Sequence, residues 1–132
     1  MLRWRGGDPS GAADDLATLA SRVSVRGESL AYEPWFFAEA LAEAGRDDEA
    51  IAALRKFQRI CPWLSVYRSW AYPRSLFLLA RAHARRGERD EAVRNLDQLL
   101  LDWRDADAGS PLVREARQLR TSLVGGATPA TR

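Results

Sequence analysis

Residues 44–54 read Ala-Gly-Arg-Asp-Asp-Glu-Ala-Ile-Ala-Ala-Leu, and residues 86–96 read Arg-Gly-Glu-Arg-Asp-Glu-Ala-Val-Arg-Asn-Leu. Gly, Asp-Glu-Ala and Leu stand at the same offsets in both stretches, which begin 42 residues apart. Glycine can adopt the left-handed conformation that ends a helix, and aspartate can start the next helix. A small alanine lets two helix backbones approach closely. The two stretches therefore predict a repeated helix–turn–helix unit.

The sequence around these stretches predicts further helices. Alanine and leucine dominate, β-branched residues are sparse, and Gly and Pro are spaced apart rather than clustered, which is typical of helical chains. The first helix is expected to start at Asp8-Pro9-Ser10 and to stop near Gly27. Six helices are expected in all, over about residues 12–25, 33–44, 47–60, 73–86, 90–103 and 111–123.

The apolar residues of each helix predict its inward-facing side. In the first helix an i, i+3, i+4, i+7 stripe is expected to face the core. The later helices carry similar stripes. The expected inward residues are Leu16, Leu19, Ala20 and Val23, then Ala50, Ile51, Leu54 and Phe57, then Leu76, Leu79, Ala80 and His83, and finally Ala92, Val93, Leu96, Leu99 and Leu100.

The repeated unit resembles the tetratricopeptide repeat, whose signature is a large residue, a large-small pair and an aromatic, followed by Ala-x3-aromatic and Pro. The matching residues are Phe37, Ala38, Leu41, Gly45, Ala50, Leu54 and Pro62 in the first unit, and Leu76, Leu79, Ala80, His83, Gly87, Ala92 and Leu96 in the second. Pro34 stands where Trp is usual, and His83 replaces an aromatic. The period exceeds the family's usual length of about 34 residues, and the insertion is expected at Trp63–Trp70.

The resemblance implies an all-α fold of antiparallel helix pairs in a tetratricopeptide-like α-α superhelix. We expect one domain over residues 11–124, with repeat units at about 30–62 and 72–104, flanking helices at about 12–25 and 111–123, and flexible ends at 1–10 and 125–132. With so few repeats, the flanking helices are expected to cap the array, unless chains associate. The region also resembles the C-terminal helical repeats of bacterial multidomain signalling proteins such as serine/threonine kinases, so the chain is either a stand-alone protein or a detached C-terminal part.

The resemblance also implies a binding surface on the concave face, formed by the first helix of each pair. The residues at the corresponding positions are Tyr32, Trp35, Phe36, Glu39 and Glu43 in the first unit, and Arg74, Phe77, Leu78, Arg81 and Arg85 in the second. The three arginines are spaced by seven and four residues, which puts their guanidinium groups on one helical face, where they can bind carboxylates or phosphates bidentately. Alternatively, Arg81 and Arg85 pair with Glu39 and Glu43 or belong to a merely solvated face. The N-terminal helix could likewise cover Trp35 and Phe36.

Trp63, Tyr67, Trp70 and Tyr72 form the densest aromatic stretch, with Arg59, Arg68 and Arg74 interleaved. Packing between the repeats is the first interpretation of these aromatics. A protein contact is the second, and base stacking is the third.

Composition excludes several other functions. Twenty basic residues, 19 of them Arg, oppose 18 acidic ones; the net charge of +2 is too small to indicate a nucleic-acid surface, and the arginine preference is typical of a GC-rich genome. One Cys and one His predict neither disulfides nor a metal site. Neither a phosphate-binding loop nor a catalytic pair of Cys61 and His83 is expected, so no cofactor is expected either. Without a signal-like or membrane-spanning apolar stretch, a cytoplasmic protein is expected.

These observations predict a non-catalytic scaffold that binds a protein or peptide, including an acidic one, on its concave face, with no nucleic-acid or membrane partner. The alternative is a structural dimerisation or spacer module, in which a homodimer buries the aromatic segment. Burial of the tryptophans within one chain would favour the first interpretation, and an exposed aromatic patch the second.

Overall fold

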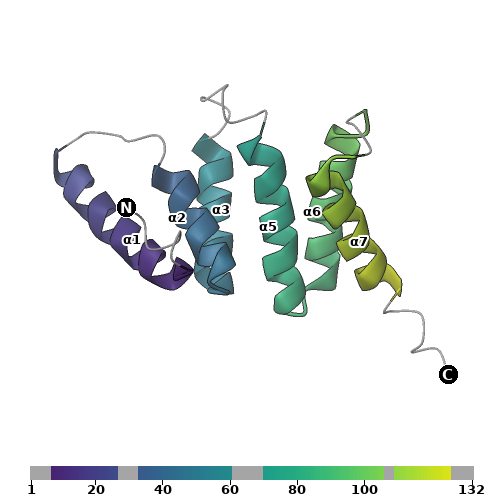
Figure 1. Cartoon of the computed structure of the whole chain (residues 1–132), viewed down its shortest axis with the longest axis horizontal. Helices are drawn as coiled ribbons and strands as arrows, with labels where there is room; N and C mark the ends of the chain where they lie inside the picture. The colour runs from purple at the N-terminus through teal and green to yellow at the C-terminus, as the bar shows by residue number, and fades with distance from the viewer. Residues whose placement is uncertain (1–6, 27–32, 61–69, 106–108, 126–132) are drawn as a thin grey trace. The chain divides into compact units, whose positions relative to one another are not determined.

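The structure is a computed structural model, and it describes residues 7–26, 33–60, 70–105 and 109–125. Within these ranges the chain forms six helices and no strand, so the predicted all-α fold is confirmed. The chain divides into two compact units, Met1–Ser65 and Val66–Arg132. Each unit contains one helix pair joined by a tight turn and one flanking helix (Figure 1).

The N-terminal unit consists of α1 (Pro9–Arg26), α2 (Glu33–Glu43) and α3 (Asp47–Ile60). Helix α2 contacts both α1 and α3, and every residue from 38 to 42 is buried. On α3, the four apolar residues expected to face inward are buried. Helix α2 therefore lies at the centre of this unit. Its residues 38–42 expose no polar side chain to solvent.

The start of α1 follows the sequence prediction, but its inward face does so only at Leu16. Asp8 accepts a hydrogen bond at 2.8 Å from the backbone N–H of Gly11, which caps the helix. The buried side chains are Ala12, Ala13 and Leu16, whereas Leu19 is 44% exposed. The expected stripe is therefore wrong at Leu19, because the face toward α2 is set by the alanine pair; the side chains of Ala20 and Val23, and Gly27, lie outside the described residues.

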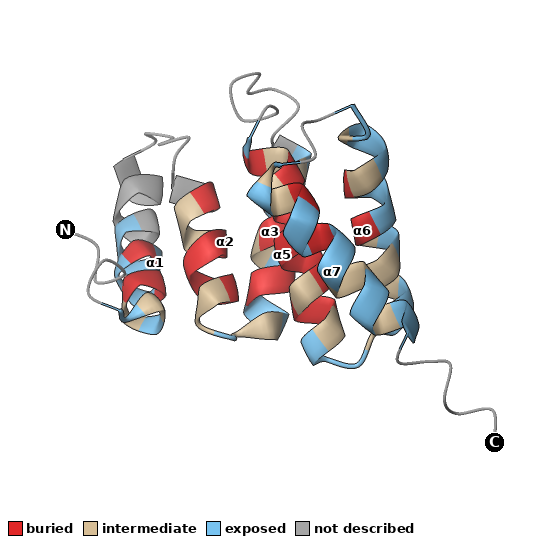
Figure 2. Cartoon of the chain, turned by 45° about the vertical axis from the view of Figure 1, so that its right-hand side comes forward, coloured by how far each residue is buried: buried red, intermediate tan, exposed pale blue. Residues whose placement is uncertain are grey.

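The C-terminal unit consists of α5 (Ala71–Arg85), α6 (Arg89–Asp102) and α7 (Pro111–Gly125). Helices α5 and α6 form the pair, and α7 packs on α6 and also contacts α5. All four residues predicted to face inward on α5 are buried, as are Ala92, Leu96 and Leu99 on α6. On α7 the buried residues are Val113 and Ala116, while the opposite side is largely exposed (Figure 2).

The two helix pairs share one turn geometry. Gly45 has a φ of 73° and Gly87 a φ of 79°, the left-handed region that favours glycine. After each glycine the next residue donates its backbone N–H back into the helix, Arg46 to the Leu41 carbonyl at 3.1 Å and Glu88 to the His83 carbonyl at 2.9 Å. The glycines themselves donate to residues 42 and 84. This is the Schellman motif, and it confirms that both glycines end helices.

Candidate peptide-binding surface

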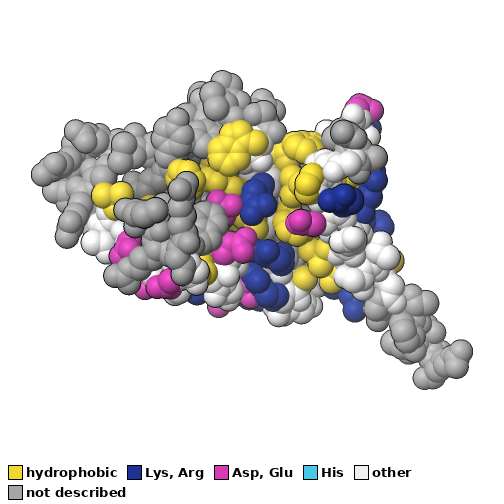
Figure 3. Space-filling view, viewed as in Figure 1, with side chains coloured by type: hydrophobic (Ala, Val, Ile, Leu, Met, Phe, Trp, Pro, Cys, Tyr) yellow, Lys and Arg dark blue, Asp and Glu magenta, His cyan; other side chains and the backbone are white. Residues whose placement is uncertain are grey.

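The predicted arginine row lies on α5. This helix contains Arg74, Arg81 and Arg85 and has no acidic residue. Arg85 is exposed, and the other two arginines are partly exposed. Lys and Arg side chains form a column over α5 in the space-filling view (Figure 3). The helix therefore presents a row of positive charge at its surface.

Aromatic and apolar side chains lie beneath this row. The guanidinium carbon of Arg81 is 5.9 Å from the centre of the Phe77 ring, within the range of a cation–π contact. Phe77 is only 7% exposed, and Leu78 is buried. Phe77 and Leu78 therefore support the row from below, and the arginines carry most of the surface that a partner can reach.

Two of the five residues predicted in the first unit are buried. Trp35 is 1% exposed, and its ring centroid lies 5.1 Å from that of Phe57, so its indole packs in the core of the N-terminal unit. Glu39 is 8% exposed, while Phe36 and Glu43 are partly exposed. Tyr32 lies outside the described residues. Burial leaves Trp35 and Glu39 little surface for a partner.

The aromatic stretch before α5 is described only at its end. Trp63 and Tyr67 lie outside the described residues. Trp70 is 44% exposed, and Tyr72 is partly exposed. The first interpretation of this stretch was packing between the repeats. At Trp70 the structure does not agree with it, because this side chain is nearly half exposed.

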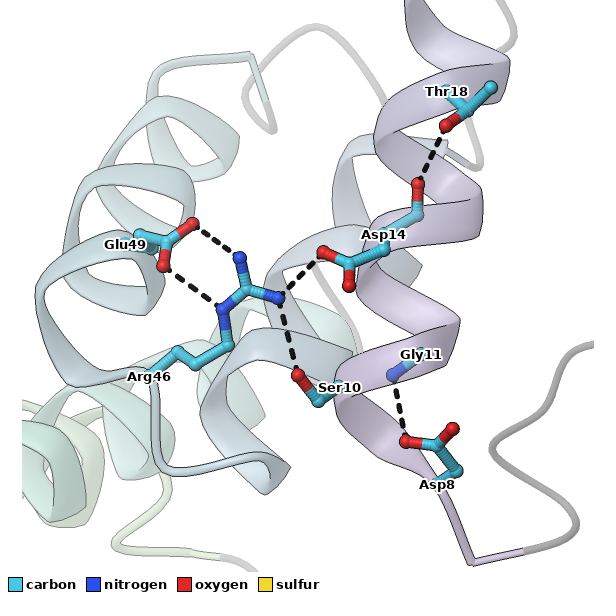
Figure 4. A network of polar contacts seen from close by, with 7 residues as sticks. All are labelled: Asp8, Ser10, Gly11, Asp14, Thr18, Arg46 and Glu49. Carbon is cyan, nitrogen blue, oxygen red and sulfur yellow. Dashed lines mark hydrogen bonds and ion pairs between the residues drawn. The ribbon is translucent and has the colours of Figure 1, made fainter.

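A polar cluster that the sequence analysis did not find centres on Arg46 (Figure 4). Its guanidinium donates to both carboxylate oxygens of Glu49, at 3.0 and 2.8 Å, and to Asp14 at 2.9 Å and Ser10 at 3.4 Å. Hydrogen bonds to Glu49 first, and to Asp14 second, raise the pKa of Arg46. The cluster ties α1 to the turn between α2 and α3. Its one local signal in the sequence is an Arg directly after the cap glycine, three residues before a Glu.

Glu88 occupies the equivalent place in the second unit, with the opposite charge. It accepts a hydrogen bond from Arg86, and its Oε2 lies 3.0 Å from Nδ1 of His83. The contact with Arg86, and secondarily that with His83, lowers the pKa of Glu88 below its ordinary value. His83 itself is 2% exposed, which makes the imidazole part of the core in contact with the turn.

Of the pair Cys61 and His83, only His83 lies in the described ranges. Cys61 lies outside them. Among the described residues, no group of three His, Cys, Asp or Glu side chains is placed to hold a metal ion. None of the helices that could be searched is long and apolar enough to cross a membrane.

Two stretches of the chain, residues 37–62 and 74–106, match the Tetratricopeptide repeat family. The matches fall on the pairs α2–α3 and α5–α6, and the residues between them include the insertion expected at 63–70. Neither the curated proteins nor the solved structures contain a match to this chain. The two matches show similarity to the tetratricopeptide repeat over both helix pairs, and the helices of the described ranges agree with its all-α fold.

Proposed function

We propose that this protein is a non-catalytic interaction module that captures an acidic segment of a partner protein through α5. Tetratricopeptide repeats generally mediate protein–protein interaction, so the two matches support the general role. The charge of α5 supports the acidic partner. Its row of three arginines, with no carboxylate in the helix, is the single observation that carries the proposal, because guanidinium groups bind carboxylates bidentately.

The test replaces the three row arginines together, as Arg74→Gln, Arg81→Gln and Arg85→Gln. Binding of a fluorescently labelled oligo-glutamate peptide is measured by anisotropy, with an oligo-lysine peptide as the charge control. The matched protein control is Arg94→Gln, Arg114→Gln and Arg117→Gln, three exposed arginines of α6 and α7 with the same loss of charge. Loss of binding in the row variant alone supports the proposal. Equal binding by both variants contradicts it.

Self-association is the second candidate, and exposed apolar residues favour it. Trp70 precedes α5, and Leu101, which is 56% exposed, lies near the end of α6. Because α5 and α6 are antiparallel, both residues lie at the end of the pair opposite the Gly87 turn (Figure 1). Contiguous exposed apolar patches often mark contact surfaces.

Light scattering after gel filtration, over a tenfold concentration range, tests this second candidate. A dimer that dissociates on Trp70→Ser with Leu101→Ser supports self-association. A monomer at every concentration contradicts it.

A further inference from the structure

We infer that the side of α1 that carries Leu19 is a docking site for a helix of another protein, and that this helix carries an aromatic residue followed three positions later by a small one. The site lies on α1 rather than on α5, so the inference goes beyond the proposed function. It rests on the correspondence between α1 and the second helix of each pair, α3 and α6.

Helix α1 has the residue pattern of a second helix. The pattern is an alanine, a large apolar residue four positions later and another large apolar residue three positions after that. The three sets are Ala12, Leu16 and Leu19 in α1, Ala50, Leu54 and Phe57 in α3, and Ala92, Leu96 and Leu99 in α6. The first two residues of every set are buried. Helix α1 therefore corresponds to the second helix of a further repeat.

The third position of the pattern distinguishes α1 from the other two helices. Phe57 is 1% exposed and Leu99 is 0% exposed, whereas Leu19 is 44% exposed. Trp35 of α2, the helix before α3, covers Phe57, and the two ring centroids lie 5.1 Å apart. Leu19 therefore stands at the position that a preceding first helix covers in the pair α2–α3.

The neighbours of α6 show the same arrangement in full. Helix α6 packs against α5, which precedes it, and against α7, which follows it. Among the described helices, α1 packs against α2, which follows it. The place on α1 that corresponds to that of α5 on α6 is therefore the Leu19 side, and a helix docked there would continue the interface between first and second helices that the chain already forms twice.

The two first helices indicate which kind of helix fits this place. Each carries an aromatic residue ten positions before its cap glycine, and an alanine three positions after the aromatic. These residues are Trp35 and Ala38 in α2, and Phe77 and Ala80 in α5, and all four are buried. An aromatic side chain buries a large apolar area when it docks. The docking helix should therefore present the same pair of residues to Leu19.

Helix α7 of a second copy does not have this chemistry. It carries a proline 14 residues before a glycine, as α5 does, and so corresponds to a first helix. Glu115 and Gln118 occupy its aromatic and small positions, and both are exposed. Packing an unpaired carboxylate against Leu19 would be unfavourable. The first helices α2 and α5 already pack within their own pairs, so the docking helix is assigned to another protein.

The experiment measures binding of an end-blocked, fluorescently labelled peptide with the sequence of residues 33–46, which carries the pattern of α2, to the full chain by anisotropy. Leu19→Asp in the full chain should weaken binding at least about tenfold. Leu101→Asp, at another exposed leucine, adds the same charge and should bind the peptide as the wild type does. Equal affinities of the two variants, or no binding by the wild type, would overturn the site.

Two further measurements test the identity of the docked helix. The peptide with Trp35→Ser should bind about tenfold more weakly, and equal binding of both peptides would overturn the aromatic requirement. Light scattering without peptide tests for a second copy at the site. A dimer that Leu19→Asp dissociates would overturn the assignment to another protein, whereas equal masses of Leu19→Asp and wild type support it. Circular dichroism checks that each variant is helical.

Discussion

Arg46 is the residue at which the polar contacts of the N-terminal unit converge. Its partners lie 36 and 32 residues earlier, at Ser10 and Asp14, and three residues later, at Glu49. A sequence pattern can show only the last of these, because the α1 partners become neighbours only after folding. The same limit applies to Trp35, because its partner Phe57 belongs to the next helix. The residue pattern of one helix therefore could not predict that Trp35 is buried.

Replacing Arg46 by Ala should loosen α1 without unfolding the helix pair. The Arg46 side chain is 30% exposed and that of Asp14 69%, so each ion pair contributes little, and the total loss should be about 1 kcal/mol of unfolding free energy. Hydrogen exchange should show faster exchange in α1, with smaller changes in α3. Arg94→Ala removes an exposed ion pair within α6 and should leave hydrogen exchange in α1 unchanged. Equal effects of the two variants on α1 would mean that Arg46 does not hold α1 to the turn between α2 and α3.

Glu88 predicts an effect of pH on stability. Because Arg86 and then His83 lower its folded-state pKa below the ordinary value of 4.5, the carboxylate stabilises the fold above pH 4.5. This contribution disappears as the pH falls through the lowered pKa. The wild-type protein should therefore exceed Glu88→Gln in stability at pH 6, and the difference should shrink in acid.

Urea unfolding at several pH values measures this difference. Glu115→Gln, at an exposed position of α7, serves as the comparison. A gap between wild type and Glu88→Gln that persists unchanged at pH 3 would show that charge on Glu88 is not its source.

At the scale of the elements, the tight turns were the most predictable part of the fold. Gly45 and Gly87 end their helices as the repeat indicated, because only a few residues tolerate the left-handed conformation. The inward face of α1 was less predictable. A stripe of apolar residues predicts which side of the helix is apolar. In the structure the small side chains of Ala12 and Ala13 are buried, and Leu19 is exposed.

Replacing either of these glycines should lower the stability of the fold through backbone strain alone. A Cβ at either position would meet no atom within 4 Å, so Gly45→Ala and Gly87→Ala should each lower stability by about 1 kcal/mol through the left-handed φ. Gly125→Ala lies at the end of α7 with equally open space and without a positive φ, and should be nearly neutral. Thermal unfolding followed by circular dichroism compares the three; a large loss for Gly125→Ala would contradict this account.

At the scale of the whole molecule, the charges are distributed unevenly. Residues 1–65 contain eight basic and ten acidic side chains, and residues 66–132 contain twelve and eight. The net charge of +2 therefore combines an acidic N-terminal unit with a basic C-terminal unit. Overall composition concealed this contrast, and the charge of α5 became informative only once the repeat had located the helix.

Salt should therefore weaken capture of an acidic peptide. Raising ionic strength from about 0.01 M to about 1 M shortens the screening length from about 30 Å to about 3 Å. The affinity for the oligo-glutamate peptide should fall steeply with NaCl in wild type and more gently in the triple Gln variant of the row. Anisotropy titrations at four salt concentrations give both slopes, and a salt-independent affinity would mean that charge does not hold the peptide.

The opposite charges at Arg46 and Glu88 have a consequence for the repeats as interchangeable parts. Both residues follow a cap glycine and use the same backbone hydrogen bonds, yet their side chains face different neighbours, Asp14 and Glu49 in one unit and His83 and Arg86 in the other. A second copy of the first pair, inserted in place of the second, would replace His83 with leucine and reverse the charge at the turn. The two turns share one backbone conformation, but their side chains have different partners. The two repeats are therefore not interchangeable.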